Sequence, residues 1–154
     1  MEDVVLFLHL LGVLTFVAGI AVAGIPFEAA RRRDDAGEIA ILLGLTRYGV
    51  VLVGSGALLL LVCGLWLVGL EHDVGFGTGW VDAAIVLFLI AVALGSLGGR
   101  VPKKARLLAT DLAEGGQSVN PSLRALLDDP VSRAANYASA VLVLAVLALM
   151  VFKP

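Results

Sequence analysis

The stretch VVLFLHLLGVLTFVAGIAVAGIPF, residues 4–27, decides the fold of this chain. It holds no Asp, Glu, Lys or Arg, and His9 is its only ionisable side chain. As an α-helix rising about 1.5 Å per residue, it is longer than the ~30 Å hydrocarbon core of a bilayer. Glu2 and Asp3 precede it where a signal peptide would carry Lys or Arg, so we predict a retained membrane span.

The composition extends this prediction to the whole chain. Its 154 residues are 60% hydrophobic and 16% charged, with a mean hydropathy of +1.00, whereas soluble domains are about 45–50% apolar and about 25% charged. Further apolar runs are long enough to cross a bilayer. We therefore predict an all-α membrane protein, a single domain over residues 1–154 that forms a four-transmembrane-helix bundle. The expected spans are 4–27, 49–70, 82–99 and 134–152.

Three side chains are expected at the membrane–water interface. Arg47 interrupts an apolar run from 39 to 70 that is too long for one crossing, so its charge is placed among the headgroups while 39–45 continues the helix. Trp80 precedes the third span and fits an interfacial aromatic belt. Arg133 opens the fourth span in the same way as Arg47 opens the second.

The connection 100–133 is expected to begin with a short amphipathic helix outside the hydrocarbon. Apolar and charged residues alternate there at helical spacing, and Gly115-Gly116 would end the helix. The apolar positions are Val101, Ala105, Leu108 and Leu112, and the charged positions are Lys103, Lys104, Arg106 and Asp111. This basic helix is expected to lie on anionic lipid headgroups, with docking of a cytoplasmic partner as the alternative.

A second short helix is expected in the same connection. Asn120 followed by Pro121 is a typical pair of N-cap and first helical residue, and the helix would run through Leu127. Pro130 is expected to stop it.

The distribution of positive charge predicts the orientation. Cytoplasmic connections carry an excess of Lys and Arg. Of the eleven such residues, four lie in or beside the first connection, six lie in the third, and Lys153 alone lies on the other side. The first group is Arg31, Arg32, Arg33 and Arg47, and the second is Arg100, Lys103, Lys104, Arg106, Arg124 and Arg133. Both termini are therefore expected outside, in a bacterial inner (cytoplasmic) membrane.

Small residues are expected to carry the helix packing, because lipid offers little hydrophobic drive between helices. One stripe on the first span reads His9, Gly12, Phe16, Gly19 and Ala23. It places His9 on the face turned toward other helices. In the third span, Ala91, Gly95 and Gly99 are four apart and include one GxxxG motif. Such glycine faces also suggest a homo-oligomer.

His9 carries the chemical hypothesis, because an ionisable residue inside a span is a functional-site candidate. With both termini outside, His72 and Met150 are expected at the same depth, so His9 could bind haem b or copper alone or with either of them. Alternatively, His9 hydrogen-bonds a backbone carbonyl or a hydroxyl such as Thr15 or Ser55. A proton relay or solute path is the third reading.

No stronger functional signal is present in the sequence. It has no HExxH, Walker A or GxSxG motif, and its one cysteine, Cys63, excludes a zinc pattern or an internal disulfide. Aromatic residues are sparse and no basic patch is interleaved with them, which argues against nucleic-acid binding. Three classes stay open: a non-enzymatic metal- or haem-binding membrane protein, a transporter or channel subunit acting as a homo-oligomer, and an accessory subunit of a larger complex.

The sequence resembles one group of bacterial proteins along its whole length. The residues that carry the resemblance are LHLLG at 8–12 with Gly19, AARRR at 29–33, DPVSR at 129–133 and the closing FKP at 152–154. The group consists of small four-span predicted integral membrane proteins of unknown function. The chain is more distantly similar to the copper-resistance D domain and to the membrane protoporphyrinogen oxidase. Those proteins also place a histidine early in the first span, which implies a haem or metal role for His9.

Overall fold

The computed structural model describes residues 1–70 and 77–152, in which all regular elements are α-helices. Their order is α1 (Glu2–Ala30), α2 (Ala36–Leu70), α3 (Gly79–Gly98), α4 (Arg100–Glu114), α5 (Pro121–Leu127) and α6 (Pro130–Phe152). In these residues, four helical stretches are long and apolar enough to cross a membrane: Glu2–Ala30, Ala36–Leu70, Gly79–Glu114 and Pro121–Phe152. The predicted all-α, four-span class is confirmed.

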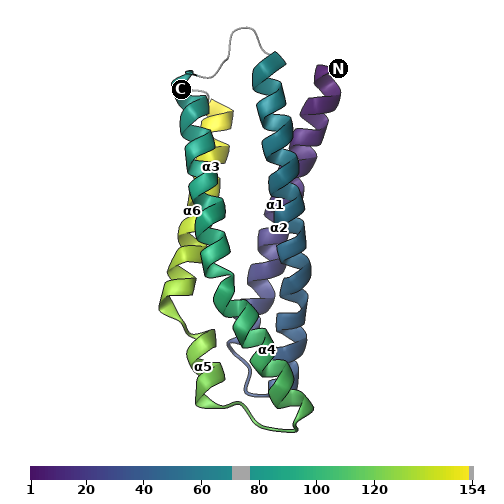
Figure 1. Ribbon diagram of the computed structural model, residues 1–154, viewed down its shortest axis with the longest axis vertical. Coiled ribbons are helices and arrows are strands. Elements are labelled where there is room, and N and C mark those ends of the chain that lie inside the picture. The colour runs from purple at the N-terminus through teal and green to yellow at the C-terminus, as the bar shows by residue number, and fades with distance from the viewer. Residues whose placement is uncertain (71–76, 153–154) are drawn as a thin grey trace.

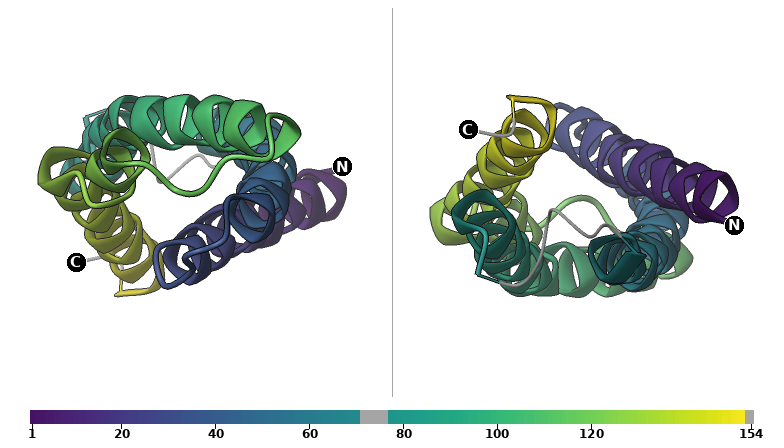
Figure 2. Two further views of the ribbon diagram at one scale, coloured as in Figure 1. Left: turned by 90° about the horizontal axis from the view of Figure 1, so that it is seen from below. Right: turned by 90° about the horizontal axis from the view of Figure 1, so that it is seen from above.

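The four long helices form two antiparallel pairs (Figure 1). The first pair is α1 with α2, and the second pair is α3 with α6; both end-on views show the same pairing (Figure 2). Both chain ends lie at one end of the bundle, and α4, α5 and the turn between α1 and α2 lie at the other. We call the latter the connection end. The prediction that both termini share one side agrees with this arrangement.

Glycines bring the backbones of the first pair together. A Cβ added to Gly12 would lie 2.8 Å from the Leu60 nitrogen, and one added to Gly19 would lie 2.6 Å from the Val53 nitrogen. On α2, a Cβ on Gly49 would clash with the backbone of Ala23. Because a larger residue would force the helices apart, the predicted stripe on α1 does pack against a neighbouring helix.

Hydroxyl groups add hydrogen bonds to the second pair. Ser132 Oγ donates to the carbonyl of Gly98 at 2.6 Å, and Ser139 Oγ donates to the carbonyl of Ala91 at 2.8 Å. Both serines are buried, so these bonds satisfy polar atoms where no water is at hand.

The expected stripe on the third span needs one correction. Gly98, rather than Gly99, is the buried glycine that faces α6, where an added Cβ would meet Asn136. Near Gly99, the closest atoms to an added Cβ are carbonyl oxygens of its own helix, those of Gly95 and Ser96. Successive helical residues are about 100° apart around the axis, so a one-residue difference selects another face.

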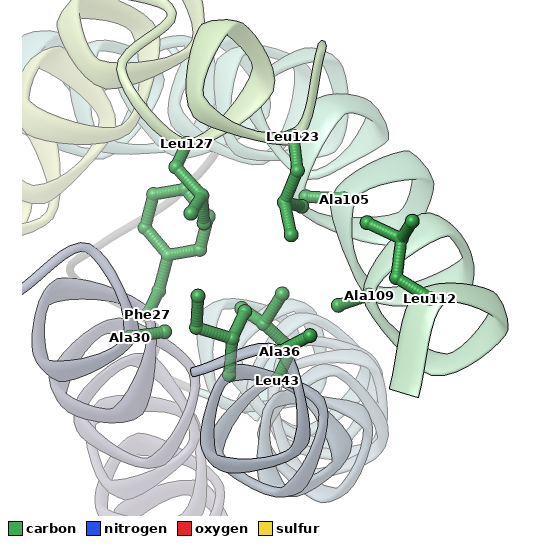
Figure 3. Close-up of a cluster of buried hydrophobic side chains, with 10 residues drawn as sticks. Phe27, Ala30, Ala36, Leu43, Ala105, Ala109, Leu112, Leu123 and Leu127 are labelled. Carbon is green, nitrogen blue, oxygen red and sulfur yellow. The ribbon is translucent and has the colours of Figure 1, made fainter. Parts of the chain in front are cut away.

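The best-buried core of the molecule lies at the connection end (Figure 3). The four largest fully buried side chains are Ile39, Leu43, Leu123 and Leu127, from α2 and α5. They pack with Phe27 and Ala30 of α1, Ala36 of α2, and Ala105, Ala109 and Leu112 of α4. The hydrophobic effect stabilises the burial of apolar side chains only where they would otherwise contact water. A core of this kind therefore indicates a water-exposed cap.

The local signals of the connection are mostly confirmed. Asn120 Oδ1 accepts a hydrogen bond from the Leu123 nitrogen at 2.8 Å, as expected of an N-cap. The turn after α4 passes through Gly116 at φ +63°, a value that favours glycine.

The predicted role of Pro130 is wrong, because α5 has already ended at Leu127 and Pro130 is the first residue of α6. The first turn of a helix tolerates proline, whose missing N–H has no helical partner there. Asp129 caps the new helix by accepting from the Ser132 nitrogen at 2.7 Å.

Candidate functional site

His9 lies on the packed face of α1 and is 6% exposed. Its Nδ1 is 3.1 Å from the carbonyl oxygen of Leu60 on α2. A carbonyl can only accept, so Nδ1 carries the hydrogen and donates it. In the neutral imidazole this leaves Nε2 with a free lone pair.

Gly64 provides the space for the imidazole on α2. A Cβ added to Gly64 would lie 3.1 Å from Cε1 of His9 and 3.3 Å from Nδ1. Leu60 and Gly64 are one turn apart on the same face, so α2 offers the ring both an acceptor and room. The sequence analysis missed both residues, because their pairing with His9 depends on the register between two helices.

Nε2 of His9 makes no hydrogen bond within the described part of the chain. Neither hydroxyl proposed as a partner reaches it. Thr15 Oγ1 donates to Leu11 O at 2.8 Å and Ser55 Oγ donates to Leu52 O at 3.2 Å, each within its own helix. The backbone-carbonyl alternative therefore describes Nδ1, while Nε2 is available to a ligand.

Met150 lies partly buried near the end of α6, against the apolar residues between the two helix pairs. It borders an apolar cavity of about 20 Å³. The other lining residues come from all four long helices: Val13, Phe16, Val17, Leu60, Phe88, Val143, Val146 and Leu147. A drug-sized ligand needs a pocket of roughly 300 Å³ or more, so this cavity as it stands holds no organic cofactor.

Other possible ligands near His9 are few. Cys63 is buried on α2, one residue before Gly64. Among the described residues no group of three or more His, Cys, Asp and Glu side chains could hold a metal ion. His72, with Glu71 and Asp73, falls outside the described residues, so its proposed partnership with His9 stays a prediction.

Two of the three expected interface residues lie at the start of a helix, and Arg47 lies inside α2. Arg47 is exposed on α2, one turn beyond the buried Leu43. Trp80 lies in the first turn of α3, and Arg133 lies in the first turn of α6 with a half-buried side chain. Their contact with headgroups stays a prediction.

An ionic cluster at the connection end was not anticipated from the sequence. Arg31 forms 2.8 Å ion pairs with Asp128 and with Glu28. The Asp128 hydrogen bond, followed by that of Glu28, raises the pKa of the Arg31 guanidinium. Arg124 of α5 donates to the carbonyl of Arg31 at 2.9 Å and pairs with Asp34. These contacts hold the α1–α2 turn against α5.

Four long apolar helices, two close-packed helix pairs and a buried cap at one end define a multi-pass integral membrane protein. Residues 3–154 match the family described as "Predicted integral membrane protein (DUF2269)". The chain therefore belongs to that family, which confirms the resemblance to small predicted integral membrane proteins of unknown function. No curated protein and no solved structure matches the chain.

Proposed function

We propose that this membrane protein binds a metal centre, haem iron or copper, through Nε2 of His9. The observation that carries the proposal is the hydrogen bond from Nδ1 to the Leu60 carbonyl. Metal-ligating histidines usually donate their second ring nitrogen in this way, which fixes the tautomer and aims the free lone pair. The position inside a membrane span adds support, because a polar side chain there usually serves a function.

Copper fits the surroundings of His9 better than haem does. His9 does not line the cavity between the helix pairs, and that cavity measures only about 20 Å³. A porphyrin bound to His9 would therefore require the pairs to separate or would lie on an outer face of the bundle. A single ion needs no such space. Imidazole and sulfur ligands suit Cu(I), and Met150 and Cys63 are the sulfur-bearing side chains to test as additional ligands.

The test is the metal content and absorption spectrum of detergent-purified protein from cells supplied with copper or with a haem precursor. We expect one equivalent of metal per chain, or a Soret band, in the unaltered protein and neither in His9→Ala. Ser139→Ala is the matched control, because Ser139 is also a buried polar residue bonded to a backbone carbonyl, in the other helix pair. It should retain the metal.

Met150→Leu and Cys63→Ala then identify any second ligand through a weaker metal affinity or a shifted spectrum. An unaltered protein that carries neither copper nor haem under both conditions would overturn the proposal. In that case the hydrogen bond to Leu60 would be the whole role of His9, joining α1 to α2.

We also propose that the membrane is a bacterial inner membrane and that the connection end faces the cytoplasm. The support is the charge distribution, since ten of the eleven Lys and Arg residues lie in or beside the first and third connections.

A further inference from the structure

The basic side chains of the connection end fall into two sets. Arg31, Arg33 and Arg124 each pair with a carboxylate of the protein. The other seven, which include Arg32, Arg47 and Arg106, form no ion pair with any described residue. Four of these seven belong to the segments that meet where α3, α4 and α6 join: Arg100, Lys103, Lys104 and Arg133. We call these four the unpaired cluster. Its positive charges have no counter-charge within the described chain.

The segments that carry the unpaired cluster meet where α3 passes into α4 beside the start of α6. The hydrogen bond from Ser132 to the Gly98 carbonyl brings these two places into contact. Arg100 follows two residues after Gly98, and Arg133 follows Ser132 directly. The cluster thus draws on two segments distant in the sequence.

Three of the four share one face of α4. Arg100, Lys103 and Lys104 are spaced i, i+3 and i+4, so they are neighbours on the helix surface, and all three are exposed. That face points away from the core that buries Ala105 and Ala109. Like charges at this spacing destabilise a helix unless an anion offsets them.

The stability of α4 does not explain why its basic residues lie near its N-terminal end. In α4 the basic residues occupy the first half, whereas Asp111 and Glu114 lie near the C-terminal end, where the helix dipole disfavours acids. A layer of negatively charged headgroups at the level of Arg100 would explain the position of these basic residues. The apolar helix α3 ends at Gly98, two residues earlier, so Arg100 lies where the chain leaves the hydrocarbon and the headgroup phosphates begin.

Arg133 adds an unsatisfied donor. Its Nε is fully buried and has no hydrogen-bond partner. Among the described residues, it is the only fully buried side-chain nitrogen or oxygen without a partner. Arginine binds phosphate well because its planar guanidinium presents several donors at once. Nε itself has no accessible surface, so a phosphate would bind this guanidinium through its other nitrogens.

We propose that the unpaired cluster binds the phosphate of an anionic phospholipid. The headgroup lies against Arg100, Lys103 and Lys104, with Arg133 at its side. The acyl chains run along the bundle, where Leu97 at the end of α3 is 50% exposed. Continuity between an exposed apolar surface and an unpaired basic cluster favours a lipid over a soluble anion, which would use only the cluster.

The experiment compares lipid binding by the full-length protein in detergent, using native mass spectrometry and thermal stability. Phosphatidylglycerol is titrated against zwitterionic phosphatidylcholine and against inorganic phosphate. Lys103→Gln combined with Lys104→Gln is the test variant; both residues are exposed, so the fold should survive. Arg32→Gln combined with Arg33→Gln removes the same charge from the exposed α1–α2 turn and is the matched control.

We expect phosphatidylglycerol to bind and stabilise the unaltered protein, with affinity falling about fivefold for each charge removed from the cluster. The control variant should stay within about twofold, the change expected of a weak long-range charge effect. Equal losses in both variants, or no loss in the test variant, would overturn the proposal. Equal stabilisation by inorganic phosphate would overturn it in favour of a soluble anion.

Discussion

The imidazole of His9 occupies space on α2 that exists because residue 64 has no side chain. The ring lies against Gly64 and is held there by the hydrogen bond from Nδ1 to Leu60. Two features of α2 thus fix one side chain of α1. This preorganisation leaves Nε2 pointing in a fixed direction, which a ligand role requires and a purely packed histidine does not.

Gly64→Ala should disturb this arrangement. The new Cβ would lie 3.1 Å from Cε1, so the ring or the helix must shift. Gly54→Ala is the control, because nothing lies within 4 Å of a Cβ there and the change gains up to about 1 kcal/mol of helix propensity. We expect Gly64→Ala to be about 1–3 kcal/mol less stable than Gly54→Ala, the usual cost of overpacking. Equilibrium unfolding in mixed micelles measures the difference, and equal stabilities would show that the ring is loosely held.

The sequence predicted His9 as a buried residue but could not predict what it touches. A stripe of small residues on one helix is visible from spacing alone, so the face was predictable. The partner residues Leu60 and Gly64 lie 51 and 55 positions away, and their pairing depends on the register between α1 and α2. The same limit explains the error at Gly98 and Gly99, since both fit a small-residue pattern and only the position of α6 chooses between them.

At the scale of elements, the contacts within a helix pair differ from the contacts between the two pairs. Within the first pair, glycines allow backbone atoms to meet. Between the pairs, side chains meet instead, such as the rings of Phe16 and Phe88 with centroids 5.7 Å apart. The glycines that suggested self-association, including Gly12, Gly19 and Gly95, are thus already engaged within the chain.

Gly19→Ala tests the close backbone contact between α1 and α2. Its Cβ would lie 2.6 Å from the Val53 backbone nitrogen, which cannot move without displacing α2. Gly24→Ala on the same helix meets nothing within 4 Å and is the matched control. We expect Gly19→Ala to be about 1–3 kcal/mol less stable than the control in the same unfolding assay. A Gly19 variant as stable as the control would mean that α1 and α2 pack less closely than described.

Arg124 links elements in the cap, since it donates to the carbonyls of Arg31 and Arg33 and pairs with Asp34. Arg124→Gln should free the α1–α2 turn at a cost of about 1–2 kcal/mol, typical of lost hydrogen bonds to a charged donor on a partly exposed side chain. Limited proteolysis of the turn should become several-fold faster, while Arg32→Gln, which removes an exposed charge nearby, should leave the rate unchanged. Equal rates in both variants would show that Arg124 does not hold the turn, which would then depend on the Arg31–Asp128 pair and the buried core beside it.

At the scale of the whole molecule, the chain combines two kinds of packing. The spans present large apolar side chains outward, such as Leu14 at 69% exposure and Leu144 at 66%, as lipid-facing helices do. The connection end buries Leu123 and Leu127 completely, as a soluble protein does. The local signals of this cap, its amphipathic helix and the Asn120 cap, were predictable because they depend on neighbours in sequence. Its joining of α1, α2, α4 and α5 into one core was not.

The orientation of the molecule is the last prediction. Under the proposed orientation, the unpaired cluster and the rest of the basic connections lie with the cap in the cytoplasm. Gly116→Cys places a thiol in the turn after α4 and reports on which side of the membrane the cap lies, and a Cβ there meets nothing within 4 Å. Because φ at Gly116 is +63°, a side chain at this position is strained. Gln117→Cys is the less strained second site. Cys63→Ala removes the native thiol from the background. In intact cells, a membrane-impermeant maleimide should leave both sites unlabelled and should react after the inner membrane is permeabilised. A cysteine at Glu2 should react without permeabilisation. Labelling of Gly116→Cys or Gln117→Cys in intact cells would reverse the orientation and place the cap, with its basic cluster, on the outer face.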